Sequence, residues 1–258
     1  MEELYPFIFK RKSYHLFRNN KTRQNYKDFL SITEEEIKDI YNKFKTLKPL
    51  CSDIKVDIKI VKAEETNCNR GEEYCILFYS EKKDNYLQNI GFLGEQLDLY
   101  LFSKEIGALW YGIGRTSEVK YNDLDFVEMM AICKVPGDSF RKDMFKSKRK
   151  ETSEIWEGSN YLDMAGIVKY APSSCNTQPW KVIEKGNILE IYRYKKEGKR
   201  GIMPINKIIY QNLIDIGIFL LFICVYLENK EINYNIKTYD DNEKCLDEYT
   251  HSFDITIL

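Results

Sequence analysis

The sequence has no surplus of charge of either sign and no long apolar run, and each absence removes a class of partner. Lysine and arginine number 39 against 40 aspartate and glutamate residues, which leaves a formal charge of −1. This balance creates no overall field that would draw the chain onto nucleic acid or an anionic membrane. The longest apolar run, residues 216–227, is too short to span a bilayer. We therefore expect neither nucleic acid nor a membrane as a partner.

Histidine is scarce, and the cysteines form no Cys-x-x-Cys pair. The chain has 7 cysteines, an odd number, and 2 histidines. Neither His15 nor His251 has a cysteine or carboxylate cluster beside it at the spacing of metal ligands, so we expect no metal site. No charged and then apolar leader opens the sequence. These features predict a reduced, cytoplasmic protein.

The most informative segment that is present covers residues 171–180, Ala-Pro-Ser-Ser-Cys-Asn-Thr-Gln-Pro-Trp. Its two prolines fix their own φ near about −65° and keep the preceding residues out of the helical region, which predicts a pre-set loop between them. The side chains there that donate and accept hydrogen bonds without carrying charge are Ser173, Ser174 and Asn176. This pattern favours a site for an uncharged cofactor that forms many hydrogen bonds.

The same ten residues resemble the signature of the nitroreductase-like flavoproteins, Ala-Pro-Ser-Ser-x-Asn-x-Gln-Pro-Trp. Members of that family bind FMN between two subunits, one of which supplies this loop. The resemblance therefore implies that four residues of the loop contact FMN. They are Pro172, Ser173, Ser174 and Asn176.

A second resemblance to the family lies near the N-terminus, at Arg11-Lys12-Ser13. It is similar to the opening with which the other subunit holds the FMN phosphate, although His15 replaces the usual second arginine. The residue types suit the task, because a guanidinium, an ammonium and a hydroxyl all donate to phosphate oxygens. A solvated surface segment is the alternative interpretation.

Two more site residues are implied by the resemblance alone. Gly112 falls where the family places a backbone N–H near flavin N5. Arg149 belongs to the basic run Lys146-Ser147-Lys148-Arg149-Lys150, which resembles the basic tail that returns to the phosphate. A solvated basic run is the alternative for the second segment.

An internal repeat organises the chain. Gln88-Asn89-Ile90-x-x-x-Gly94 recurs as Gln211-Asn212-Leu213-x-x-x-Gly217, an offset of 123 residues. The same offset aligns residues 48–53 with residues 171–176, and this first copy lacks the paired hydroxyls. We therefore expect a fused pseudo-dimer that is monomeric and holds one FMN site between its halves. The predicted halves are residues 1–145 and 146–258, which together form one compact unit.

The resemblance implies a three-layer α+β fold, in which two mixed, mainly antiparallel sheets surround buried central helices near 88–109 and 211–228. An amphipathic helix is also predicted from residue 34, where Thr33 and Glu36 fit a capping box. The implied function is an FMN-dependent NAD(P)H oxidoreductase that passes hydride through flavin N5 to a quinone, a nitroaromatic or a similar small molecule. No catalytic side chain is expected, because the flavin carries the chemistry. A flavin-binding carrier or sensor and a flavin-free scaffold remain alternatives.

Overall fold

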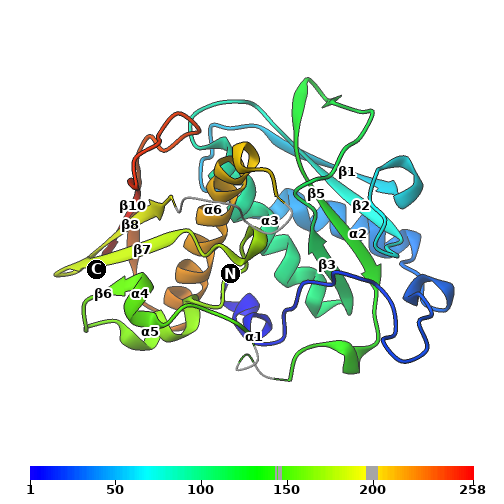
Figure 1. Cartoon of the computed structure of the whole chain (residues 1–258), viewed down its shortest axis with the longest axis horizontal. Helices are drawn as coiled ribbons and strands as arrows, with labels where there is room; N and C mark the ends of the chain where they lie inside the picture. The colour runs from blue at the N-terminus through cyan, green and yellow to red at the C-terminus, as the bar shows by residue number, and fades with distance from the viewer. Residues whose placement is uncertain (143, 145–146, 196–202) are drawn as a thin grey trace. The chain divides into compact units, whose positions relative to one another are not determined.

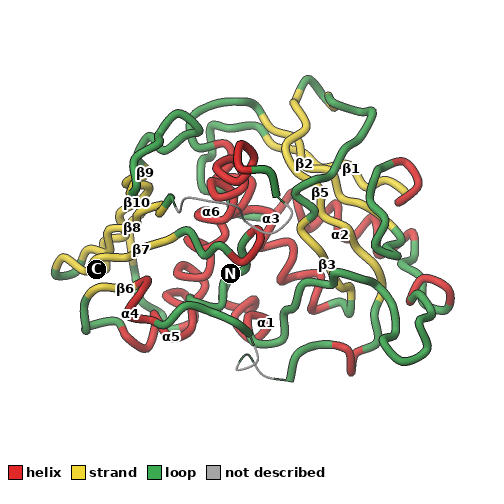
Figure 2. Tube along the Cα trace, viewed as in Figure 1, coloured by secondary structure: helices red, strands yellow, loops and turns green. Residues whose placement is uncertain are grey.

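The computed structural model describes residues 1–142, 144, 147–195 and 203–258 (Figures 1 and 2). The chain forms two compact units. The N-terminal unit comprises Phe9–Lys82 and Leu93–Asp143, and the C-terminal unit comprises Met1–Ile8, Lys83–Phe92 and Met144–Leu258. The predicted division at residues 145 and 146 lies outside the described residues.

The N-terminal unit contains a five-stranded sheet with the order β1-β2-β5-β3, and β4 pairs with β5. Its strands are β1 Val56–Lys62, β2 Tyr74–Ser80, β3 Ile106–Trp110, β4 Lys120–Tyr121 and β5 Leu124–Lys134. All four pairings between these strands are antiparallel, and the parallel contact of the predicted mixed sheet is limited, among the described residues, to the isolated bridge of Ser13 with Ala108 on β3. The strands pair antiparallel because the connections β1 to β2 and β3 to β5 both turn the chain back beside itself.

Helix α2, Glu34–Thr46, begins where the sequence predicts. The Thr33 hydroxyl accepts a hydrogen bond from the Glu36 N–H, and the Glu36 carboxylate accepts one from the Thr33 N–H. This reciprocal pair satisfies two N–H groups that a helix start would otherwise leave free. The helix ends shortly before Pro49, because a residue that precedes proline disfavours helical dihedrals.

The C-terminal unit contains the second sheet, with the order β6-β7-β8-β10-β9. Its strands are β6 Trp156–Glu157, β7 Trp180–Lys185, β8 Ile188–Tyr194, β9 Tyr234–Thr238 and β10 Tyr249–Ile257. Only β6 and β7 pair in parallel, and α5, Leu162–Val168, lies between them in the chain. The predicted combination of helices with two mainly antiparallel sheets is confirmed. The remaining helices are α1 Tyr5–Ile8, α3 Tyr86–Ser103, α4 Thr152–Ile155 and α6 Ile205–Asn229, with 3₁₀ turns at Glu2–Leu4, Tyr26–Asp28, Ala63–Glu65, Gly137–Ser139 and Ser174–Asn176.

Helix α6 forms the core of the C-terminal unit and is longer than its apolar run suggests. In the described part of the chain, Lys207–Asn229 is long and apolar enough to cross a membrane by length and composition. However, 89% of its most apolar window is buried inside the protein. Burial of this extent is what the central helix of a folded unit shows.

The first turns of α3 cross α6 at very short range (Figure 1). A Cβ atom on Gly91 would lie 2.0 Å from the carbonyl oxygen of Ile214, and one on Gly217 would lie 2.0 Å from that of Gln88. Glycine is therefore required on both helices, because it alone leaves room for the facing backbone. All four of these residues lie within the repeated Gln-Asn motifs, which cover residues 88–94 and 211–217.

Candidate functional site

The loop between α5 and β7 has an unusual backbone conformation. Cys175, Asn176 and Gln178 have φ values of 50°, 54° and 46°, in the left-handed region that residues with a side chain rarely adopt. Each such residue costs about 1–3 kcal/mol and persists only when its surroundings hold it in place. Strain of this kind clusters at ligand sites. The loop is thus a candidate site on conformation as well as on sequence.

Side chains of α6 hold this loop. The Ser174 N–H donates to Asp215 Oδ1 at 2.9 Å, and the Thr177 hydroxyl donates to Asn212 Oδ1 at 3.0 Å. Within the loop, the Gln178 N–H donates to the Ser173 hydroxyl at 2.9 Å. Neither Asp215 nor Asn212 is predicted as a site residue from the sequence. Only Asn212 belongs to the repeated Gln-Asn motif.

The basic segment around Arg149 closes over the same loop. Arg149 donates from Nη1 to Asn176 Oδ1 at 3.0 Å and from Nη2 to the Tyr170 carbonyl at 3.1 Å. The Asn176 amide in turn donates to the Lys148 carbonyl at 3.1 Å. The structure therefore brings together two predicted site residues that are 27 positions apart. Lys146, the first residue of the predicted basic run, lies outside the described residues.

The loop leaves part of its polar surface accessible. Pro172 is buried, Ser173 and Ser174 are half-buried, and Asn176 is exposed. Among the described residues, no hydrogen-bond partner is found for the Ser174 hydroxyl, whereas its N–H is anchored to α6. The loop can therefore present the neutral Ser174 hydroxyl to a ligand while its backbone stays fixed. The exposed Asn176 amide can contact a ligand in exchange for its bonds to Arg149 and Lys148.

Arg11 points into the core of the N-terminal unit. Its side chain is 5% exposed, and its Nε lies 3.0 Å from Glu95 Oε1 while Nη2 lies 2.7 Å from Asp98 Oδ2. Both carboxylates are on α3 and are fully buried. The sequence contains one sign of this contact, because Glu95 and Asp98 are acidic residues within an otherwise apolar helix.

Burial changes the protonation of this cluster. It raises the pKa of Glu95 to about 8, because the Arg11 charge offsets only part of the desolvation and the neighbouring Asp98 charge adds to it. Burial also raises the pKa of Asp98. Glu95 further accepts a hydrogen bond from Trp110 Nε1 at 3.0 Å. The raised pKa values favour a proton shared between the two carboxyl groups at neutral pH, and the Trp110 contact links the cluster to the end of β3.

A pH titration of stability tests this protonation. Between the ordinary glutamate pKa of about 4.5 and the folded value of about 8, the folded protein binds one proton more than the unfolded chain does. The free energy of unfolding should therefore fall with rising pH across this window, by up to about 1.4 kcal/mol per unit. Glu95→Gln should remove the Glu95 contribution to this slope in urea denaturation at pH 5 to 8, whereas the raised pKa of Asp98 still contributes. Parallel curves for the two proteins would contradict the assignment.

Lys12 and Ser13 remain closer to the surface than Arg11. Lys12 donates from Nζ to the Ser139 carbonyl, and burial together with the charge of Arg141 lowers the pKa of Lys12. Ser13 forms an isolated bridge with Ala108 on β3 and is half-buried. Among the described residues, no side-chain hydrogen bond of Ser13 is found. Arg141 is a further cation of this region. It lies 130 residues after Arg11 in the chain, so no local sequence pattern predicts it.

Gly112 lies in the turn that follows β3. The Gly114 N–H donates to the Tyr111 carbonyl at 2.7 Å, which closes the turn, and Gly112 is half-buried. Trp110, at the end of β3, connects this turn to Glu95.

The predicted site residues thus fall into two groups, one in each unit. The N-terminal unit holds Arg11, Lys12, Ser13 and Gly112, and the C-terminal unit holds Arg149, Pro172, Ser173, Ser174 and Asn176. Within the C-terminal group, the structure joins Arg149 to the loop. That the two groups meet around one ligand stays a prediction.

Comparisons with known proteins place this chain in a family. Residues 3–226 match the sequence profile of the family described as "Putative TM nitroreductase". The fold is similar to the crystal structure of a "putative nitroreductase" from Thermotoga maritima, with a TM-score of 0.62 and 18% sequence identity. That match covers 98% of this chain and 93% of the other. No curated protein matches the chain. The family resemblance that residues 171–180 carry in the sequence is confirmed.

Proposed function

This chain belongs to the nitroreductase family, and from this membership we propose that it is an FMN-dependent NAD(P)H oxidoreductase. Family and fold support a general oxidoreductase role. The finer proposal rests chiefly on the strained loop of residues 173–178, which is anchored to α6 and closed by Arg149. A loop held this firmly, with a neutral hydroxyl and amide on its accessible side, is pre-organised for a polar ligand.

The chemistry of the residues fits FMN. A phosphate requires cationic and hydroxyl donors, which Lys12, Ser13 and Arg141 supply in the N-terminal unit. Neutral parts of the cofactor require uncharged partners, which Ser174 and Asn176 supply in the C-terminal unit. Arg11 is already paired with two buried carboxylates, so we assign it the task of positioning its neighbours rather than gripping the phosphate alone.

Bound FMN would supply hydride transfer at its ring, from NADH or NADPH to a small acceptor such as a quinone or nitroaromatic. The residues of this chain bind and orient the cofactor. We assign Gly112, in the turn after β3 that the Gly114 N–H closes, the backbone position beside the flavin atom that gains negative charge. No side chain is assigned an acid, base or nucleophile role in this proposal.

The proposal includes one FMN site per chain, in a monomer that arose by duplication and fusion and acts in the cytoplasm. Apart from the short strands β4 and β6, each sheet is built from the chain order helix, two strands, helix and two strands. The strand orders β1-β2-β5-β3 and β7-β8-β10-β9 correspond strand by strand. Gly91 and Ile214, which meet at the helix crossing, are separated by the repeat offset of 123 residues. Contact between residues at equivalent positions of the repeat supports an origin by duplication.

Measuring FMN in the purified protein tests the proposal. We expect absorbance bands of bound flavin, about one FMN per chain, and bleaching of these bands by NADH or NADPH. The double variant Ser174→Ala, Asn176→Leu removes two hydrogen-bonding groups and should weaken FMN binding about 30- to 150-fold, at about 1–1.5 kcal/mol for each.

The matched control is Ser52→Ala, an exposed serine in the first copy of the loop, which should retain wild-type FMN binding. Equal losses in both variants would contradict the single site. Flavin that binds but does not bleach would favour the carrier or sensor alternative. A protein that takes up no added FMN would favour the scaffold alternative. The ion pairs of Arg11 with Glu95 and Asp98, within its own unit, are one observation in favour of that alternative.

A further inference from the structure

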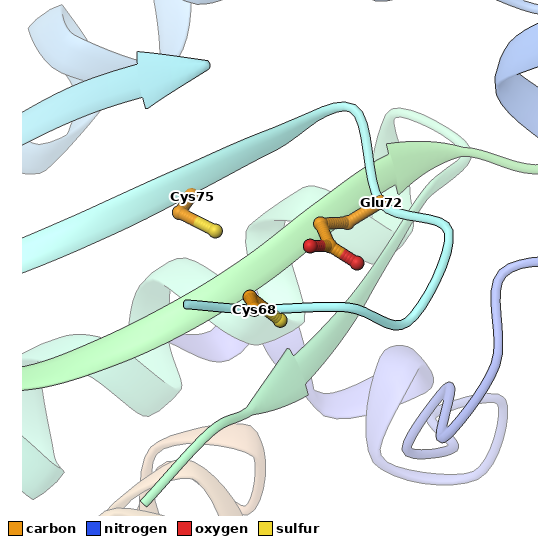
Figure 3. A group of neighbouring side chains, drawn as sticks. All are labelled: Cys68, Glu72 and Cys75. Atoms are coloured by element: carbon orange, nitrogen blue, oxygen red, sulfur yellow. The ribbon is translucent and has the colours of Figure 1, made fainter. Parts of the chain in front are cut away.

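Three side chains with metal-ligating atoms converge in the N-terminal unit, apart from the residues assigned to the flavin (Figure 3). Cys75 lies on β2, and Cys68 and Glu72 lie in the segment that leads into this strand. One sulfur or carboxylate oxygen from each side chain lies within 4.8 Å of those of the other two. The two thiols and the carboxylate are thus close enough to contact one ion.

The local backbone produces this convergence. Gly71 has a φ of 82°, a conformation that favours glycine, and an added Cβ would lie 2.9 Å from Asn25 Oδ1. The chain therefore reverses at this residue, which returns Cys75 to the level of Cys68. The prediction of no metal site was based on the absence of Cys-x-x-Cys pairs and of suitably placed histidines. The pattern Cys-x-x-x-Glu-x-x-Cys at residues 68–75 does not have this spacing, and its side chains converge only because a tight turn reverses the chain.

The cluster is buried and costly to leave ionised. Glu72 is 2% exposed and Cys75 is fully buried. One oxygen of Glu72 accepts a hydrogen bond from the Arg70 N–H at 2.6 Å, which orients the carboxylate. A bound cation would compensate the buried carboxylate charge, and the thiols would bind it as thiolates after releasing their protons.

We propose that Cys68, Glu72 and Cys75 bind a divalent transition-metal ion of the zinc class. Thiolate and carboxylate are both zinc ligands, and a Zn–S distance of about 2.3 Å with tetrahedral angles sets sulfur atoms about 3.8 Å apart. The observed limit of 4.8 Å reaches that spacing with small side-chain adjustments. Three protein ligands with one open position are the arrangement of zinc sites that accept water or a small ligand.

A neighbouring cavity supplies the open position. It has a volume of about 350 Å³, and Cys68, Glu72 and Thr66 line one part of it. Two thiolates, one carboxylate and a divalent ion carry a net charge of −1. Arg18, Lys27 and Arg70 line the same cavity together with Glu64, so three cations against one further carboxylate can balance this charge. The cavity thus provides an entry path for the ion and a place for a fourth ligand.

Titration of the full-length protein with Co²⁺ alone, after chelator treatment and dialysis, tests the proposal. We expect about one Co²⁺ per chain, with the near-ultraviolet band of thiolate bound to cobalt, and displacement of that band by Zn²⁺. Cys68→Ser should lower the affinity more than about 100-fold, because it removes one of three protein ligands. Cys51→Ser changes another half-buried thiol of the same unit and should bind Co²⁺ like the wild type. Absence of a thiolate band, or equal affinities for the two variants, would overturn the site.

A second measurement needs no variant and does not depend on flavin. Zn²⁺ should slow alkylation of Cys68 at least about tenfold, as measured by mass spectrometry of the wild-type protein, while Cys51 alkylates at its original rate. Equal rates for Cys68 with and without Zn²⁺ would overturn the proposal even if a variant failed to fold. FMN content in the same samples separates this result from the proposed oxidoreductase function.

Discussion

Replacing Gly217 by alanine is expected to lower the free energy of unfolding by about 3 kcal/mol or more. The added Cβ would lie 2.0 Å from the carbonyl oxygen of Gln88 and 2.8 Å from its carbon. These are backbone atoms of α3 and cannot rotate away, so the two helices must separate. Overpacking of this kind exceeds the gain of about 1 kcal/mol that alanine brings to a helix interior. Urea denaturation, with the midpoint and the slope both fitted, gives the change directly.

Gly166→Ala in α5 is the matched control for this prediction. A Cβ on Gly166 would meet no atom within 4 Å, so alanine should stabilise the protein by about 0.5–1 kcal/mol through helix propensity alone. Gly91→Ala should repeat the loss from the other helix, because its Cβ would lie 2.0 Å from the Ile214 oxygen. A stabilised Gly217→Ala variant would show that the crossing is looser than described.

The crossing also bears on the candidate site. Helix α6 carries Asn212 and Asp215, whose side chains hold Thr177 and Ser174 in the strained loop. A displacement of α6 at Gly217 would therefore move two of the anchors of that loop. In the proposed enzyme, Gly217→Ala should lose FMN even under conditions in which the chain remains folded.

Features that depend on neighbouring residues could be predicted from the sequence. The capping box of Thr33 and Glu36 sets the start of α2, and the prolines at 172 and 179 bound the loop. Central helices are predicted near 88–109 and 211–228, and they cover Tyr86–Ser103 and Ile205–Asn229. The first helix is shorter than predicted, because Ile106–Trp110 forms strand β3. In each case the signal is a local dihedral restriction or a continuous apolar stretch, so no distant contact was needed to recognise it.

Features that depend on distant contacts could not be predicted. Arg11 has the residue type of a phosphate ligand, yet its direction is set by Glu95 and Asp98, more than 80 residues later in the chain. The left-handed conformations of Cys175 and Asn176 follow from anchors on another helix and on the basic segment, and neither residue type requires them. The convergence of the Cys68 cluster likewise depends on a turn whose geometry the spacing alone conceals.

Asp241→Asn is expected to cost about 3–5 kcal/mol, the largest effect of any single charge change considered. Asp241 is 1% exposed and Arg193 is fully buried, and they pair through Arg193 Nη2 and Asp241 Oδ1 at 2.7 Å, with Nε 3.0 Å from both carboxylate oxygens. The Ser252 hydroxyl donates to the same carboxylate at 2.6 Å. Asparagine preserves the shape but leaves a buried guanidinium without a counter-charge, and this is the costly way to break a buried pair.

Two comparisons isolate that electrostatic cost. The Lys59–Glu118 pair has side chains that are 33% and 42% exposed, so Glu118→Gln should change stability by less than about 1 kcal/mol. Arg193→Met combined with Asp241→Leu removes both charges and should recover most of the loss, because no unpaired ion remains. Denaturation of the variants side by side gives the coupling energy. If the double variant were no more stable than Asp241→Asn, the loss of stability in Asp241→Asn would come from packing and not from the unpaired charge. The contact between β8 and the segment before β10 would then depend on the shape of the two side chains.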